Sequence, residues 1–178
     1  MGYTPLEGLV MGTRSGTVDP GILLHAQRQL GFSVDQLDEI LHKQSGLLGL
    51  SGLSSDFRKL EAAAAEGHER ARLALDVYAH RIRGTIGSLA VTLGGIDALA
   101  FTGGIGENSS RLRTEICEGL GCLGVQLDDK RNATAAADCD VAAPDSSARV
   151  LIIHTREELM IAREVRSLAS DSTAGTSP

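Results

Sequence analysis

The segment FTGGIGENSS, residues 101–110, holds the residues of this chain best suited to receive a phosphate. Gly103, Gly104 and Gly106 lie between an apolar run, IDALAFT, and an amphipathic stretch, SSRLRTEICEGL. A helix N-terminus after a strand attracts phosphate, and glycine lets a ligand approach the backbone. Ser109 stands where a Rossmann fingerprint needs its third glycine, and no G-K-[ST] follows to make a P-loop. These residues alone leave nucleotide binding and a structural turn both open.

A second candidate is the arginine of MGTRSG, residues 11–16. Arg14 lies between Thr13 and Ser15 and is flanked by glycines, so we expect it in a loop rather than on a helix face. Guanidinium is the preferred planar partner of a phosphate or a carboxylate. The alternative is an ordinary salt bridge within the loop.

Two glutamates in HTREEL follow an apolar run that predicts a strand. Thr155 and Glu158 have the spacing of a capping box, which gives Glu158 a structural task. Glu157 is not needed for that box, and its carboxylate could hold Mg²⁺ through the waters of the ion. The alternative for Glu157 is compensation of the helix dipole in the first turn. Asp56 in SSDFRKLE stands near the start of a predicted helix, where it could be only a helix cap. His154 is also noted, because it lies at the end of a predicted strand near the presumed site.

Composition limits the classes of function. The chain has 178 residues, 42% hydrophobic and 22% charged, which is typical of one globular domain with a core. The net charge of −6 and the 3% aromatic content, with no Trp, argue against a nucleic-acid partner. The three cysteines show no C-x-x-C spacing, which argues against a disulfide framework or a zinc site. No apolar run has the length of a membrane span and MGYTPLEG is unlike a signal peptide, so we expect a cytoplasmic protein with no membrane partner.

Helical patterns fill the first half of the chain after a Gly-rich opening loop. PGILLHAQRQLG predicts a helix that stops at Gly31, and SVDQLDEILHKQSG opens with a capping box of Ser33 and Gln36. Residues 58–93 are helical in pattern, with a break near Gly67. The second half of this stretch is apolar, so we expect it to be buried, with its two glycines in close helix packing.

The second half of the chain alternates strands and helices. IDALAFT and ARVLIIHT read as buried strands, and each is followed by a helical pattern, which predicts parallel strands in an α/β sheet. Two strands are too few for a complete sheet beside so many helices. The low-complexity segment SDSTAGTSP, residues 170–178, predicts a disordered tail.

Taken together, these segments resemble the acetate kinase family. MGYTPLEGLVMGTRSGTVDP looks like the second signature of that family, and SGLLGLSGLSSDFRKLEAAAA, LGGIDALAFTGGIGENSSRLR and VLIIHTREELMIAR match it in the same order. The resemblance extends from Met1 to about Leu168. Thr17 stands where the family usually has Asp, and His154 replaces a usual Pro.

The resemblance implies a role for each group of residues. Arg14 would stabilise the transition state, Glu157 would hold Mg²⁺, and two segments would contact ATP. Those segments are Asp56, Phe57 and Arg58, and the loop of Gly104, Ile105, Gly106, Glu107 and Asn108.

The resemblance also implies that much of the family's pattern is absent. Acetate kinases are about twice as long, and their first half carries an N-x-G-S-S-S-x-K motif that does not occur here. We therefore expect residues 1–169 to be the C-terminal, nucleotide-binding half of an acetate kinase, with the helix-rich α/β fold and partial sheet of an actin-like ATPase.

The activity implied is ATP + acetate ⇌ ADP + acetyl phosphate in a homodimer, with the chain inactive on its own. The alternatives are a non-catalytic nucleotide-binding or dimerisation module, and a kinase for another short-chain acid such as propionate.

Overall fold

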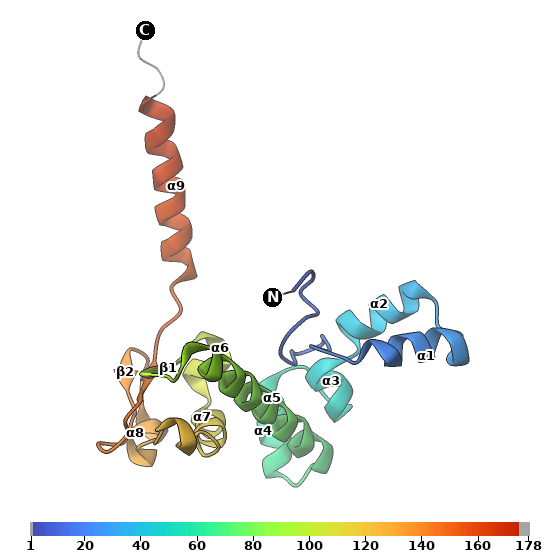
Figure 1. The fold of residues 1–178 in the computed structure, drawn as a ribbon, viewed down its shortest axis with the longest axis horizontal. Coiled ribbons are helices and arrows are strands. Elements are labelled where there is room, and N and C mark those ends of the chain that lie inside the picture. Colours follow the sequence, from blue (N-terminus) through green and yellow to red (C-terminus); the bar gives the residue numbers. More distant parts are fainter. Residues whose placement is uncertain (1, 175–178) are drawn as a thin grey trace.

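The computed structural model describes the backbone of residues 2–174 and the side chains of residues 2–168. Helices dominate, and a three-stranded sheet lies at one end of the molecule (Figure 1). This agrees with the predicted helix-rich α/β class. The elements are α1 (Pro20–Leu30), α2 (Val34–Lys43), α3 (Gly46–Ser51), α4 (Phe57–Ala65), α5 (Glu69–Leu93), β1 (Ala98–Phe101), α6 (Gly103–Asn108), α7 (Ser110–Cys117), the 3-10 turn η1 (Gly121–Leu123), α8 (Asp129–Thr134), β2 (Cys139–Asp140), β3 (Arg149–Ile152) and α9 (Glu157–Ala174).

The predicted helix boundaries in the first half are confirmed by their caps. α1 ends at Gly31, whose φ of 73° is the left-handed conformation that glycine adopts without strain. The capping box of Ser33 and Gln36 is present in full at the start of α2. α4 and α5 are separated at Gly67, where the break was predicted.

The sheet has the order β1-β3-β2. β1 and β3 are parallel neighbours, with Phe101 opposite Ile152, as the two predicted strands require. β2 is antiparallel to β3, and with only two residues it is too short to give a sequence pattern. Because β1 and β3 are parallel, their carboxyl ends meet at one edge, where α6 and the residues before α9 begin.

One hydrophobic core joins the helices to the sheet. Leu60 of α4 and Leu75 of α5 are buried with Ile116 of α7 and Ile152 of β3, each at most 1% exposed. α5 packs on α3, α4 and α7, so it connects the N-terminal helices to the strand side of the molecule. α4 and the loop after β1 are thereby fixed against each other.

The second half of α5 differs from the prediction. Leu89, Val91 and Leu93 are 57%, 82% and 75% exposed, and the space within 4 Å of a side chain at Gly84 or Gly87 is open. The expected close glycine packing is therefore wrong for the described residues. The expected burial is only partly present, because Ala90 is buried and Ile82 and Ile86 are half-buried. Most of the buried residues of α5 lie in its first half, namely Ala71, Ala74, Leu75 and Ala79.

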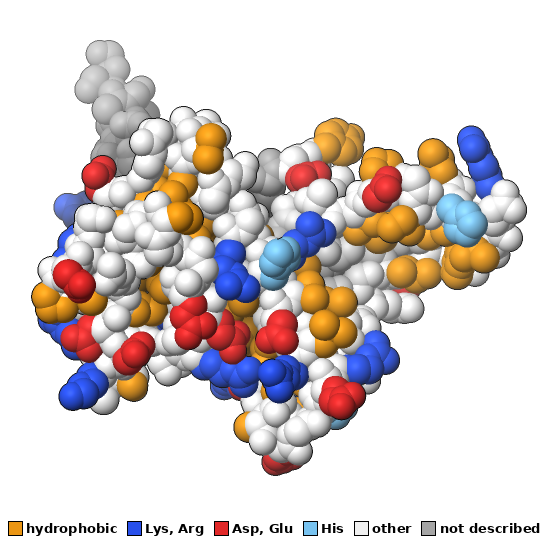
Figure 2. Space-filling view, turned by 60° about the horizontal axis from the view of Figure 1, so that its bottom comes forward, with side chains coloured by type: hydrophobic (Ala, Val, Ile, Leu, Met, Phe, Trp, Pro, Cys, Tyr) orange, Lys and Arg blue, Asp and Glu red, His pale blue; other side chains and the backbone are white. Residues whose placement is uncertain are grey.

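Two peripheral regions expose apolar side chains. α9 projects away from the rest of the molecule (Figure 1). All its side chains through Leu168 are exposed. The helix continues to Ala174, so residues 170–174 are helical rather than disordered as predicted, and residues 175–178 lie outside the described part. The lobe of α1 and α2 also exposes hydrophobic side chains, visible at one end of Figure 2. No described helix combines the length and the hydropathy that crossing a bilayer requires.

Candidate functional site

A cavity of about 530 Å³ lies between α4 and the glycine-rich loop that follows β1. It brings together two segments that were predicted separately, one around residue 56 and one around residue 105. The lining residues are Asp56, Phe57, Arg58 and Glu61 on one side, and Gly104, Ile105, Asn108 and Ser109 on the other. Six of the eight predicted nucleotide contacts therefore share one cavity.

The α4 side of the cavity is charged. Asp56 is the N-cap of α4, where its Oδ1 accepts the backbone N–H of Arg58 at 3.0 Å, so the cap alternative describes it correctly. Its Oδ2 also lies 3.2 Å from Arg58 Nη2, and this hydrogen bond lowers the pKa of Asp56. The Arg58 side chain is 86% exposed, so most of its guanidinium remains open to a ligand.

The glycine side of the cavity is a short helix, α6, that begins directly after β1. Gly103 starts it with a φ of 75°, a conformation that other residues adopt only with strain. A side chain at Gly104 would meet nothing within 4 Å, so the backbone there faces open space. Asn108 donates from Nδ2 to the Gly104 carbonyl at 2.8 Å and closes the turn.

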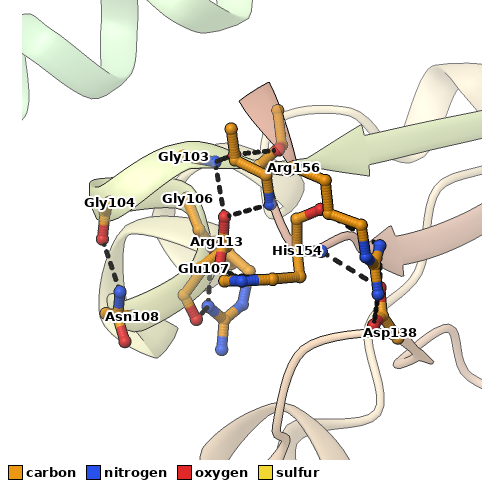
Figure 3. A network of polar contacts seen from close by, with 11 residues as sticks. Gly103, Gly104, Gly106, Glu107, Asn108, Arg113, Asp138, His154 and Arg156 are labelled. Atoms are coloured by element: carbon orange, nitrogen blue, oxygen red, sulfur yellow. Dashed lines mark hydrogen bonds and ion pairs between the residues drawn. The ribbon is translucent and has the colours of Figure 1, made fainter. Parts of the chain in front are cut away.

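Glu107 and Gly106 do not line the cavity. The Glu107 carboxylate instead accepts hydrogen bonds from backbone N–H groups, and a ring nitrogen of His154 lies beside it (Figure 3). The hydrogen bond with His154, followed by that from the Thr155 N–H, lowers the pKa of Glu107 to about 2. The role of Glu107 as a nucleotide contact stays a prediction, and its carboxylate points to the segment before α9 rather than into the cavity.

The predicted capping box before α9 is also wrong. The Thr155 hydroxyl lies 2.7 Å from Thr102 Oγ1 and accepts the Gly103 N–H at 2.8 Å, while the Thr155 N–H donates to Glu107. Thr155 therefore bonds to the loop after β1 and not to Glu158. The sequence spacing could not show that the parallel neighbouring strand would supply these competing partners.

Glu157 begins α9, and its carboxylate is exposed. No cluster of three potential metal ligands occurs among the described residues. Mg²⁺ suits such a position, because it keeps several waters and takes its other ligands from substrate phosphates.

Arg14 is exposed in a loop that is anchored to α3. The Ser45 N–H donates to the Thr13 carbonyl at 2.9 Å, and the Leu48 N–H donates to the Gly12 carbonyl at 2.9 Å. Gly12 packs against the Ser55 carbonyl, one residue before Asp56, so the loop adjoins the α4 side of the cavity. The guanidinium makes no ion pair with any described residue, so the loop salt-bridge alternative is not realised there.

The sequence reading missed two cavity residues, Glu61 and Ser109. Glu61 lies one turn after Phe57 on α4, and that spacing of four residues could have placed both on one helix face. Ser109 lies directly after the predicted glycine loop, and it caps α7.

Residues 1–163 match the Acetokinase family. The chain is 58% identical over 164 residues to an acetate kinase from Gloeobacter violaceus, which covers 92% of this chain and 40% of that protein. A crystal structure of Porphyromonas gingivalis acetate kinase aligns with a TM-score of 0.90 at 40% identity, covering 95% of this chain and 43% of that one. A propionate kinase structure from Francisella tularensis aligns with a TM-score of 0.86 at 42% identity, covering 92% of this chain and 42% of that one.

The chain thus spans about 40% of the length of the curated relatives that it matches. Its structural neighbours have an actin-like ATPase fold, so the predicted fold class is confirmed. The position of this span within the relatives stays a prediction.

Proposed function

Because the chain belongs to the acetokinase family, we propose that it forms part of an active site that transfers a phosphoryl group between ATP and acetate, giving ADP and acetyl phosphate. The observation that carries the proposal is the cavity between Asp56–Arg58 and Gly104–Asn108. Its volume of about 530 Å³ is in the range of small-molecule sites. Two segments that resemble nucleotide contacts of one family line this cavity together.

The chemistry of the cavity suits a nucleotide. The Arg58 guanidinium is a mostly exposed cation on one side, and the backbone at Gly104 offers an approach without a Cβ on the other. Both features favour a phosphate group. Phe57 is 6% exposed and its ring packs on Tyr78, so we assign it to the cavity wall rather than to stacking on a base.

Arg14 and Glu157 complete this chain's share of the proposed site. Phosphoryl transfer depends on positioning and on neutralising the charge of the moving group. An exposed arginine without an ion-pair partner among the described residues can supply that charge, and Glu157 can hold Mg²⁺ together with water and phosphate oxygens. When bound, Mg²⁺ would shield the negative charge of the phosphates.

The rest of the enzyme lies outside this chain in the same proposal. A span of about 40% of the relatives' length leaves the acetate-binding groups to the remainder of the protein. We further propose a homodimer and a cytoplasmic location, where ATP is available. A second candidate substrate, propionate, is favoured by the similarity to a propionate kinase structure at 42% identity.

The test is a chimera in which this chain replaces the matching span of the Gloeobacter violaceus acetate kinase. We expect ATP- and Mg²⁺-dependent formation of acetyl phosphate, measured as the hydroxamate, with the parent enzyme as control. Parallel assays with propionate are a control for the acid pocket, which the remainder of the parent enzyme supplies. A chimera that is folded and binds ATP but phosphorylates neither acid would overturn the proposal.

A further inference from the structure

The Glu107 carboxylate links two segments that β1 and β3 bring side by side. Its Oε1 accepts the Gly103 N–H at 3.0 Å and the Thr155 N–H at 2.8 Å (Figure 3). Its Oε2 lies 2.7 Å from His154 Nδ1. The side chain is 11% exposed, so it is enclosed by these partners rather than presented to a ligand. One carboxylate therefore joins the first residue of α6 to the residues just before α9.

Arg113 holds the other end of α6. Its guanidinium donates from Nη1 to the carbonyls of Gly106 at 2.8 Å and Glu107 at 2.9 Å. It also bonds through Nε and Nη2 to Asn132, and the residue is 2% exposed. Burying such a charge is unfavourable unless its hydrogen bonds are satisfied, so this contact fixes the geometry of the last turn of α6.

The position of Glu157 gives these contacts a consequence for the proposed site. Glu157 follows Thr155 by two residues, and Gly104 follows Gly103 directly. The Glu107 carboxylate thus sets where the proposed nucleotide backbone contacts lie relative to the proposed Mg²⁺ ligand. A carboxylate aimed at the nucleotide itself would be repelled by the phosphates.

We propose that Glu107 is a positioning residue, which fixes the nucleotide loop against the segment that carries Glu157 and does not bind the nucleotide. This inference rests on the proposed function, because the spacing of the two segments matters only when Mg²⁺ and a nucleotide bind between them. Arg113 anchors the opposite end of α6, so Glu107, together with the Thr155 hydroxyl that also accepts the Gly103 N–H, fixes the placement of its N-terminal end.

The first experiment measures amide hydrogen exchange in the full chain without ligand. Glu107→Gln keeps the size of the side chain and removes its charge, so we expect exchange to accelerate roughly tenfold in both residues 102–108 and residues 153–157. Glu115→Gln is the matched control, because the carboxylate of Glu115 pairs with Arg111 on α7 and touches neither segment. Acceleration in one segment only, or in neither, contradicts the proposal.

A second variant separates the backbone bonds from the ion pair. His154→Ala leaves both N–H bonds of Glu107 intact and replaces a side chain that is 58% exposed. We expect protection to change by less than about threefold in that variant. An effect as large as that of Glu107→Gln would show that the His154 contact, and not the bridge between the two N–H groups, holds the segments together.

The functional experiment uses the active chimera. Glu107→Gln should raise the Mg²⁺ concentration for half-maximal activity roughly tenfold, and it should add nothing in a Glu157→Gln background. If Glu107 has only a structural role, the variant will have a lower melting temperature and an unchanged Mg²⁺ dependence. That result would overturn the proposal. Failure of the unmutated chimera to phosphorylate an acid would refute the proposed function instead, while the exchange experiment would still test the bridge.

Discussion

Ser109 donates its hydroxyl hydrogen to Glu61 Oε1 over 2.6 Å, and this bond joins the start of α7 to α4 across one wall of the cavity. The same hydroxyl oxygen accepts the Leu112 N–H at 3.1 Å and thereby caps α7. One side chain thus closes a helix end and holds the two sides of the cavity together.

Replacing Ser109 should cost more stability than replacing its partner. Ser109→Ala removes both the cap and the bond to Glu61, so we expect a loss of about 1–2 kcal/mol in the free energy of unfolding. Glu61→Gln keeps the cap and can still accept the hydroxyl hydrogen, so its loss should stay below about 1 kcal/mol. Chemical denaturation measures the free energy of unfolding of both variants. Equal losses of this free energy would contradict the double role of Ser109.

Arg14→Ala in the active chimera should lower kcat on the order of 10³-fold, with little change in the KM for ATP. The reason is that Arg14 is exposed, makes no ion pair with a described residue and lies in a loop beside the α4 side of the cavity. Steady-state kinetics measures both constants. Arg28→Ala, at an exposed position on α1, is the control and should leave kcat unchanged. A loss of kcat of less than about tenfold for Arg14→Ala would show that Arg14 does not stabilise the transition state.

Glu157→Gln should weaken the Mg²⁺ dependence of the chimera by roughly tenfold, as expected for a charged ligand of the ion. Glu158→Gln should change neither the Mg²⁺ dependence nor the melting temperature by much, because the capping box that would have used Glu158 is absent. A Mg²⁺ titration and a thermal melt of both variants test this difference. Identical titrations would show that Glu157 has no special role.

The acid stability of the chain should depend on Glu107. Its pKa is lowered from 4.5 to about 2, chiefly by the hydrogen bond with His154, so the folded state favours the charged carboxylate. The stabilisation is therefore present above pH 4.5 and is lost as the pH falls toward 2. Glu107→Gln should lower the free energy of unfolding at pH 6. In this variant the free energy of unfolding should also fall less steeply between pH 4.5 and pH 2 than in the unmutated chain. Urea denaturation at several pH values measures this difference. If the free energy of unfolding depends on pH in the same way in the variant and in the unmutated chain, the prediction is refuted.

The features of the fold that were predicted correctly depend on residues that lie close together in the sequence. The caps at Ser33 and Gly31, the break at Gly67 and the two parallel strands each depend on nearby residues or on a repeated apolar pattern. The glycine segment was found from its composition of three glycines, whereas Asp56, Phe57 and Arg58 were assigned to ATP only by the resemblance to acetate kinases.

The errors arose where distant residues compete with local ones. Thr155 and Glu158 have the spacing of a capping box, yet the hydroxyl of Thr155 bonds instead to Thr102 and Gly103, which follow the neighbouring strand β1. Glu107 lies inside the segment predicted to contact ATP, and its carboxylate accepts the Thr155 N–H from the segment before α9, a contact that the local sequence does not indicate. Such preferences depend on strand register, which the sequence pattern does not contain.

The last prediction concerns the chain without the rest of a kinase. Residues 1–178 alone should bind an adenine nucleotide at the cavity of Asp56 and Gly104 but should form no acetyl phosphate. In the proposed function this chain supplies Arg14, Glu157 and the glycine loop, and it spans about 40% of the relatives' length. Phosphoryl transfer requires the acceptor and the nucleotide to be held in line. A site that lacks some of the residues that hold them therefore loses nearly all of the reaction rate. Isothermal titration with Mg-ADP measures binding, with Arg58→Ala as the variant that should weaken it, and a hydroxamate assay measures turnover. Turnover within about tenfold of the chimera would show that this chain already holds every group the reaction needs.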